Sequence, residues 1–262
     1  MPSRSRAGVL ALLCTAFVAA GCTPADEPVA YTTLSFERTL EECPGQSRPC
    51  ATVSLSYPDI TRAGSAAVVD SLNRGILRPL LQSIDIEGSR ESPEALAEEL
   101  FFYYSKTVRE FPDYAARWYI ERSAQIALDS LGILSVEFSD NTYTGGAHPL
   151  HQQYLHLYDT RTGAPLPVDS LLAEGGREPL VALGEREFRR VRAIAPESKL
   201  NEAGFWFQGN RFALGQNIGL TRRGLEIIFN PYEIAPYAMG STRLVLPYDS
   251  LQAVLELSRR SR

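Results

Sequence analysis

Histidine side chains that could bind a metal or transfer protons are concentrated in one short segment. All three histidines of the 262-residue chain, His148, His151 and His156, fall within nine residues. Residues an odd number of positions apart on a strand point to opposite faces, so His151 and His156 would diverge, and zinc would need a further ligand such as Asp159. We therefore expect no metal site and no bound cofactor here. We expect His148, close to Gly146, to hydrogen-bond the backbone of a turn.

The sequence lacks the short motifs of common hydrolases and phosphate-binding proteins. No Gly-x-Ser-x-Gly pattern occurs, and Met239-Gly-Ser-Thr lacks the second glycine. No glycine-rich loop leads into Lys-Ser/Thr. The two carboxylates of a glycosidase can lie anywhere in a sequence, so a hydrolase or deacetylase-like enzyme with a site near His148 is an alternative. We assign no catalytic residue, and the missing motifs favour a protein without enzymatic activity.

Two turn segments contain the candidate binding residues. The runs 141–148 and 230–237 each end an apolar stretch with glycines or prolines that fix the backbone. Their tyrosines combine an apolar ring with a polar tip, which suits protein contacts, sugar stacking or packing on a sheet. Asn230 is expected to bond its own turn. The aromatic run 205–207 is either a lid on the core or a docking patch. The candidate binding residues are Tyr143, Gly145, Gly146, His148, Asn230, Tyr232 and Tyr237.

The first 22 residues have the order of a secretory signal. Arg4 and Arg6 precede an apolar stretch, and small residues lead into Cys22. This ending resembles a bacterial lipobox, which implies acyl chains on Cys22 and attachment to the membrane through that lipid. The alternative is ordinary signal cleavage that leaves Cys22 free. We expect a protein of the bacterial cell envelope, anchored at the outer membrane and facing the periplasm or the surface.

Charge and cysteine content narrow the class further. Removal of residues 1–21 takes away two arginines and no acid, which changes the formal net charge from −5 to −7. Such an acidic chain is a poor nucleic-acid binder and suits a cationic partner. Cys43 and Cys50 enclose a Pro/Gly loop between two strand-like runs. Outside the cytoplasm this arrangement predicts a disulfide that joins a hairpin.

The periodicity of apolar residues predicts an α+β fold: a largely antiparallel sheet flanked by helices, in two closely packed halves. Expected strands span 31–41, 51–57, 118–129, 134–138, 154–158, 225–229 and 242–246. Expected helices span 65–82, 93–111 and 178–194, and a final helix contains Leu251, Val254 and Leu255. The predicted organisation is a signal over 1–21, a tether over 22–29, a first module over 30–140 and a second domain over 141–258.

The residues of both halves resemble known families. Tyr-Thr-Gly-Gly-Ala-His at 143–148 and the strand at 154–158 resemble the start of the domain DUF3298, and the run 224–240 resembles its end. In the upstream half, Ser-Tyr-Pro at 56–58 and the helix that contains Leu-Asn at 72–73 are similar to the DUF4163 module. That module accompanies DUF3298 and precedes the catalytic domain of certain PdaC-type peptidoglycan deacetylases. The resemblance covers roughly residues 30–256.

The resemblance implies an envelope domain that recognises a ligand. DUF3298 also forms the extracellular part of RsiV-type anti-sigma factors, which bind lysozyme. The expected partners are therefore a lysozyme-like protein or peptidoglycan, besides the membrane. The sequence has neither a sigma-binding segment nor a deacetylase domain after the resemblance, so we expect neither of those activities. A purely structural envelope lipoprotein is a further alternative.

Overall fold

The computed structural model describes residues 27–41 and 50–257. It contains a five-stranded sheet of order β1-β2-β3-β4-β5 and a three-stranded sheet of order β6-β7-β8. Every strand pair except β2–β3 is antiparallel. The predicted α+β class with a largely antiparallel sheet is confirmed. The elements are β1 (Ala30–Leu40), β2 (Ala51–Arg62), α1 (Ala66–Leu80), α2 (Pro93–Glu110), β3 (Trp118–Ser130), β4 (Ile133–Tyr143), β5 (Leu150–Asp159), α3 (Arg177–Val191), β6 (Ile218–Thr221), β7 (Gly224–Phe229) and β8 (Thr242–Leu246).

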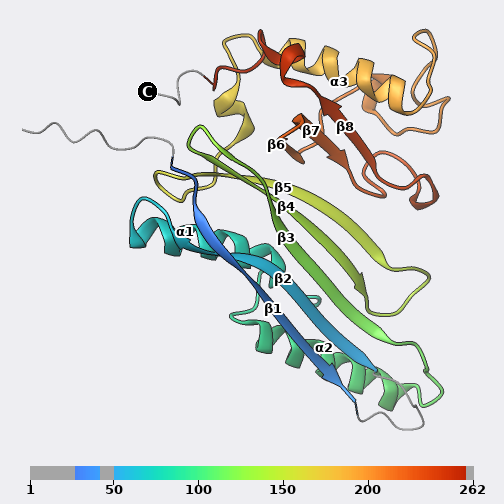
Figure 1. The fold of residues 1–262 in the computed structure, drawn as a ribbon. Helices are drawn as coiled ribbons and strands as arrows, with labels where there is room; N and C mark the ends of the chain where they lie inside the picture. The colour runs from blue at the N-terminus through green and yellow to red at the C-terminus, as the bar shows by residue number, and fades with distance from the viewer. Residues whose placement is uncertain (1–26, 42–49, 258–262) are drawn as a thin grey trace, which may run out of the picture.

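The two N-terminal helices connect the parallel pair β2–β3. Parallel strands need a long crossover connection, and α1 and α2 provide it. Ser65 and Ser92 cap the two helices, because their hydroxyls accept from the backbone N–H groups of Val68 and Ala95. Pro93 occupies the first turn of α2, where its missing N–H costs nothing. Both helices lie along one face of the five-stranded sheet (Figure 1).

One end of the five-stranded sheet is buried on both faces. Ile133 and Leu157 belong to an apolar cluster formed with the C-terminal part of the chain, whereas Leu134 and Tyr158 belong to a cluster with α1. Side chains alternate between the faces of a strand, so consecutive buried residues indicate that both faces are covered. Figure 1 shows the three-stranded sheet and α3 beyond β5. Phe188 of α3 is fully buried at the centre of that C-terminal core.

Some predicted elements differ from the structure. Residues 248–251 form a single 3₁₀ turn where a final helix was predicted, because the residues that follow bond to the backbone of 171–173 instead of continuing a helix. The four-residue strand β6 was not predicted. Arg122 lies buried on β3, on the same face as the buried Ile120 and Ala124. β4 spans the predicted boundary between residues 140 and 141, and it pairs with both β3 and β5.

Several predicted features lie outside the described residues: the signal peptide, Cys22 and Cys43. Cys50 is fully buried, with its sulfur 3.2 Å from the carbonyl oxygen of Leu40. The disulfide to Cys43 therefore stays a prediction. Within the described residues, no helix combines the length and the apolar character needed to cross a membrane.

Candidate functional site

The two predicted turn segments meet in space. The ring of His148 stacks on the ring of Tyr237, with centroids 3.6 Å apart and 17° between the planes. Its Nε2 atom lies 3.0 Å from the hydroxyl of Tyr232, although 84 positions separate the two residues in sequence. The rings of Tyr232 and Tyr237 are 5.7 Å apart. We call His148, Tyr232 and Tyr237 the aromatic platform.

Backbone contacts fix the orientation of the platform. The carbonyl oxygen of Pro149 accepts a hydrogen bond from the Tyr237 hydroxyl at 2.9 Å, and it lies 3.1 Å from Nδ1 of His148. A carbonyl only accepts, so in the neutral imidazole the Nδ1 atom carries the proton. Nε2 then accepts from the Tyr232 hydroxyl. Part of the prediction for His148 is thus observed, since its ring contacts a backbone carbonyl next to the turn.

Tyr232 has an unusual backbone conformation. Its φ angle is 71°, in the left-handed region that bulky residues rarely adopt. Its side chain is 55% exposed, so burial of the ring does not hold it in place. Non-glycine residues with such angles persist where the surroundings hold them, and they occur often at ligand-binding sites.

The glycine turn before His148 is shaped by its neighbours. The hydroxyl of Tyr143 donates to the carbonyl of Gly146 at 2.9 Å. Gly145 and Gly146 both have positive φ angles. A side chain at Gly145 would place its Cβ 2.9 Å from the hydroxyl of Tyr114. Tyr143 also lies beside Tyr119, with ring centroids 6.0 Å apart. These residues hold the turn in position, and His148 and Tyr232 of the platform are exposed.

Asn230 has a different role from the one predicted. Its Oδ1 atom accepts from the N–H of Gln153 at 2.8 Å, and its Nδ2 atom donates to the carbonyl of the same residue at 3.0 Å. The prediction that Asn230 bonds its own turn was therefore wrong in its main contact. The side chain is buried and joins the turn to β5 of the other sheet. Asn230 anchors the segment that carries Tyr232.

The histidines do not converge on one site. His151 is exposed on β5, and His156 lies further along that strand, among the rings of Phe138, Tyr154 and Tyr158. The described part of the chain has no group of three or more His, Cys, Asp or Glu side chains placed to hold a metal ion. Among the same residues, no carboxylate lies within hydrogen-bond distance of His148.

The aromatic run 205–207 divides between the two predicted interpretations. Phe205 and Phe207 are buried in the C-terminal core, where both contact Phe188 edge-to-face. Trp206 between them is exposed. Alternation along this short extended segment explains the difference.

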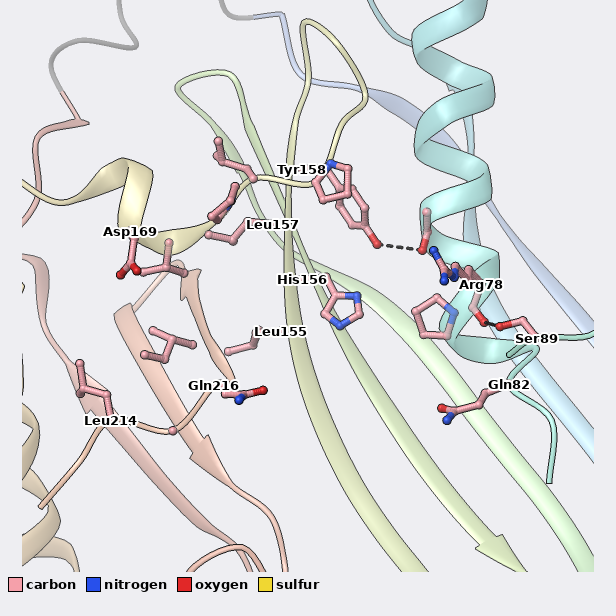
Figure 2. Close-up of a pocket in the computed structure, with 18 of the residues that line it drawn as sticks. Arg78, Gln82, Ser89, Leu155, His156, Leu157, Tyr158, Asp169, Leu214 and Gln216 are labelled. Carbon is pink, nitrogen blue, oxygen red and sulfur yellow. Dashed lines mark hydrogen bonds between the residues drawn. The ribbon is translucent and has the colours of Figure 1, made fainter. Parts of the chain in front are cut away.

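A second candidate site was missed in the sequence. A cleft of about 1060 Å³ runs along the outer edge of β5, between the C-terminal end of α1 and the segment 214–218 (Figure 2). His156 lies between the two walls, and burial lowers the pKa of its imidazole. A smaller cavity of about 260 Å³ shares Pro79, Gln82 and His156 with the cleft and ends at Arg122 and Asp140. No sequence motif marks this cleft, because its walls come from segments far apart in the chain.

Comparisons with known proteins extend the description of the fold. Residues 169–249 match the family model DUF3298, described as a protein of unknown function, and residues 45–151 match a model described as deacetylase PdaC. A member of the DUF3298 family from Bacteroides fragilis NCTC 9343 has a similar structure, with 20% sequence identity and a TM-score of 0.66 over 88% of this chain and 97% of that chain. A DUF3298 family protein from Pseudomonas aeruginosa PAO1 is 19% identical, with a TM-score of 0.63 over 88% of this chain and 96% of that chain. No curated protein matches the chain.

The predicted resemblance to DUF3298 is confirmed for the run 224–240, whereas residues 143–158, predicted as the start of that domain, lie before the matched region. The PdaC model covers much of the upstream half, and it extends past residue 140 to include the glycine turn and His148. At identities near 20% the solved structures show a shared fold and no more. The finer assignments to DUF4163 and to RsiV-type proteins stay predictions.

Proposed function

We propose that this protein is a lipid-anchored recognition module of the bacterial cell envelope, and that the aromatic platform binds an envelope protein or glycan. The observation that carries the proposal is the exposed ring of Tyr232, held in a left-handed backbone conformation beside His148 and Tyr237. Exposed tyrosines offer a large apolar area with few rotatable bonds and a polar tip. Such rings suit stacking on a sugar or packing against a protein surface.

The composition of the platform favours binding over catalysis. The described hydrogen-bond partners of His148 are a tyrosine hydroxyl and a backbone carbonyl. A general base needs a substrate proton within reach, and a third group usually orients it for that purpose. Here the ring is stacked flat on Tyr237, and both its nitrogens are engaged by the protein. The deacetylase activity named for the matched family model is therefore not part of the proposal.

Charge supports a basic protein partner. The mature chain carries a formal charge of −7 if residues 1–21 are removed. Long-range attraction would speed association with a cationic enzyme such as a lysozyme, and salt would weaken this effect. A lysozyme-like protein is the first partner to test, and peptidoglycan is the second.

The test uses residues 23–262, which include every described residue. Calorimetric titration with a lysozyme at low and at physiological salt should show saturable binding that weakens with salt. Tyr232→Asn should abolish binding without loss of stability, because Asn tolerates the left-handed region better than Tyr. Tyr31→Ser is the matched control, since Tyr31 is an exposed tyrosine on β1 away from the platform. Full-strength binding by Tyr232→Asn would remove the platform from the proposal.

The lipid anchor is tested separately. Cys22→Ser should shift the protein from the membrane fraction to the soluble fraction of the envelope, and the acyl mass should disappear from its amino-terminal peptide. A membrane-bound Cys22→Ser protein, or an unmodified Cys22 in the wild type, would contradict the anchor and leave the platform proposal unaffected.

A further inference from the structure

The cleft along β5 has two walls of different chemistry. The wall formed by the end of α1 and the following loop is polar, with Arg78, Gln82 and Ser89. The opposite wall is mostly apolar and is formed by Leu155, Leu157, Leu166, Val168, Leu214 and Ile218, with the amide of Gln216 at its edge. Figure 2 shows Gln82 and Gln216 on opposite sides of β5. A ligand that fills this space needs one apolar side and one side rich in hydrogen-bonding groups.

Several polar groups of the cleft have no partner within the described part of the chain. The side chains of Arg78, Gln82 and Gln216 are exposed, and neither they nor the imidazole of His156 make a hydrogen bond to another described residue. Polar groups in a partly closed site favour a ligand that replaces their water contacts, because an apolar ligand would leave them desolvated at a cost. A purely apolar occupant such as an acyl chain is therefore disfavoured.

The charges of the lining cancel. Arg177 forms an ion pair with Asp169 at 2.6 Å. The other two charged residues of the lining, Arg78 and Glu87, have opposite charges, so the lining has no net charge. Burial lowers the pKa of His156, so this residue adds no charge at neutral pH. A neutral imidazole presents one donor and one acceptor. Because its lining has no net charge, the cleft favours neither an anionic nor a cationic ligand.

The size of the cleft sets the scale of the ligand. A volume of about 1060 Å³ lies at the upper end of the range for small-molecule sites. The smaller cavity continues the space past Gln82 and His156 towards Arg122 and Asp140, whose charges are already paired. The cleft and the aromatic platform have no residue in common.

We propose that the cleft along β5 is a second binding site, which takes an uncharged saccharide chain of a few sugar rings. A pyranose ring has an apolar face of C–H groups, which matches the leucine-rich wall, and an edge of hydroxyls, which matches the amide of Gln216 at the edge of that wall and the amide of Gln82 across from it. The hydroxyls would bond to Gln82, Gln216 and His156. The interaction involves no net charge, so its affinity is independent of salt.

Three uncharged tetrasaccharides test the proposal: the β1,4-linked tetramers of N-acetylglucosamine and of glucose, and the α1,4-linked tetramer of glucose. Residues 23–262 are titrated with each by calorimetry. At least one should bind saturably, with the same affinity at low and physiological salt. Gln82→Ala combined with Gln216→Ala should weaken binding about tenfold, the expected result of losing two hydrogen bonds to the ligand. Both side chains are exposed, so the double variant should unfold at the wild-type temperature.

Matched variants separate this site from the platform. Gln252→Ala changes an exposed glutamine outside the cleft and should leave affinity unchanged. Tyr232→Asn should also leave it unchanged. The proposal is overturned if none of the three saccharides binds, or if the double glutamine variant binds as tightly as the wild type. Loss of binding in Tyr232→Asn would instead place the sugar on the platform. A failed lysozyme titration has no bearing on these outcomes.

Discussion

Asn217 and Asn230 both donate a side-chain hydrogen bond to the same acceptor, the carbonyl oxygen of Gln153. Their Oδ1 atoms accept from the backbone N–H groups of Leu155 and Gln153, at 2.9 and 2.8 Å. β5 is an edge strand of the five-stranded sheet, and an edge strand leaves backbone groups without a neighbouring strand. The two asparagine amides provide those missing partners. They therefore join the C-terminal part of the chain to the first sheet without a continuous ladder.

Removal of these amides should destabilise the protein. Asn217→Ala and Asn230→Ala should each lower the free energy of unfolding by about 1–3 kcal/mol, because half-buried backbone groups of β5 lose their hydrogen-bond partners. The double variant should lose more unfolding free energy than the two single variants together, because the carbonyl of Gln153 then has neither amide donor. Urea unfolding measures these values. Asn201→Ala, at an exposed position, is the control, and a loss of the same size there would contradict the argument.

The buried ion pair beneath the end of α1 should be sensitive to removal of one partner. Arg122 donates to Asp140 at 2.8 Å and to the carbonyls of Leu80 and Gln82 at 3.0 and 2.6 Å. Arg122→Met should cost about 3–5 kcal/mol, because the carboxylate of Asp140 stays buried without its charge partner. Replacement of both residues, as Arg122→Met with Asp140→Leu, should recover part of this loss. Chemical denaturation measures these free energies of unfolding. An Arg122→Met protein within about 1 kcal/mol of the wild type would contradict the prediction.

Gly75 should not accept a side chain. A Cβ at this position would lie 2.5 Å from Cε1 of Tyr158, and that ring is buried and donates its hydroxyl to the carbonyl of Gly75 at 2.8 Å. Gly75→Ala should therefore lower stability by about 1–3 kcal/mol, even though alanine favours helix. Gly64→Ala is the control, because a Cβ there meets open space. Thermal unfolding of the two variants compares them, and equal melting temperatures would show that the ring can move aside.

Protonation of His156 should lower stability in mild acid. Burial lowers its pKa in the folded state below the ordinary value of 6.5, so the unfolded chain binds the proton more readily. The stabilisation is complete above pH 6.5 and is lost as the pH falls from 6.5 through the folded pKa. The unfolding free energy measured at pH 7.5 and at pH 5.5 should thus fall less in His156→Gln than in the wild type. Identical slopes in the two proteins would show that His156 does not cause the change.

Local sequence patterns predicted most of the fold. The helices predicted over 65–82 and 93–111 and the strand alternation depend on residues a few positions apart, and the structure has α1, α2 and the corresponding strands there. The failures have local causes too. β6 has four residues, too few for a periodicity to show, and the apolar end of the chain turns once at 248–251 and does not continue as a helix.

The sequence indicated the residues of the aromatic platform as candidates, but it did not predict the contacts between them. The glycines and tyrosines of the two turns stand out in the sequence, but the stacking of His148 on Tyr237 links distant segments. The same limit explains Asn230, whose partner lies 77 positions away. The cleft along β5 left no signal, since its glutamines and leucines are ordinary residues until the fold brings them together.

The aromatic platform contains residues from both matched regions of the chain. His148 falls within the region matched by the PdaC model, and Tyr232 and Tyr237 fall within the region matched by DUF3298. Neither matched region contains all three rings, so a protein with only one of them would lack the ring stack. A chain divided between residues 151 and 169 would therefore form the platform only when its two pieces associate, and recovery of binding on mixing them would report that association.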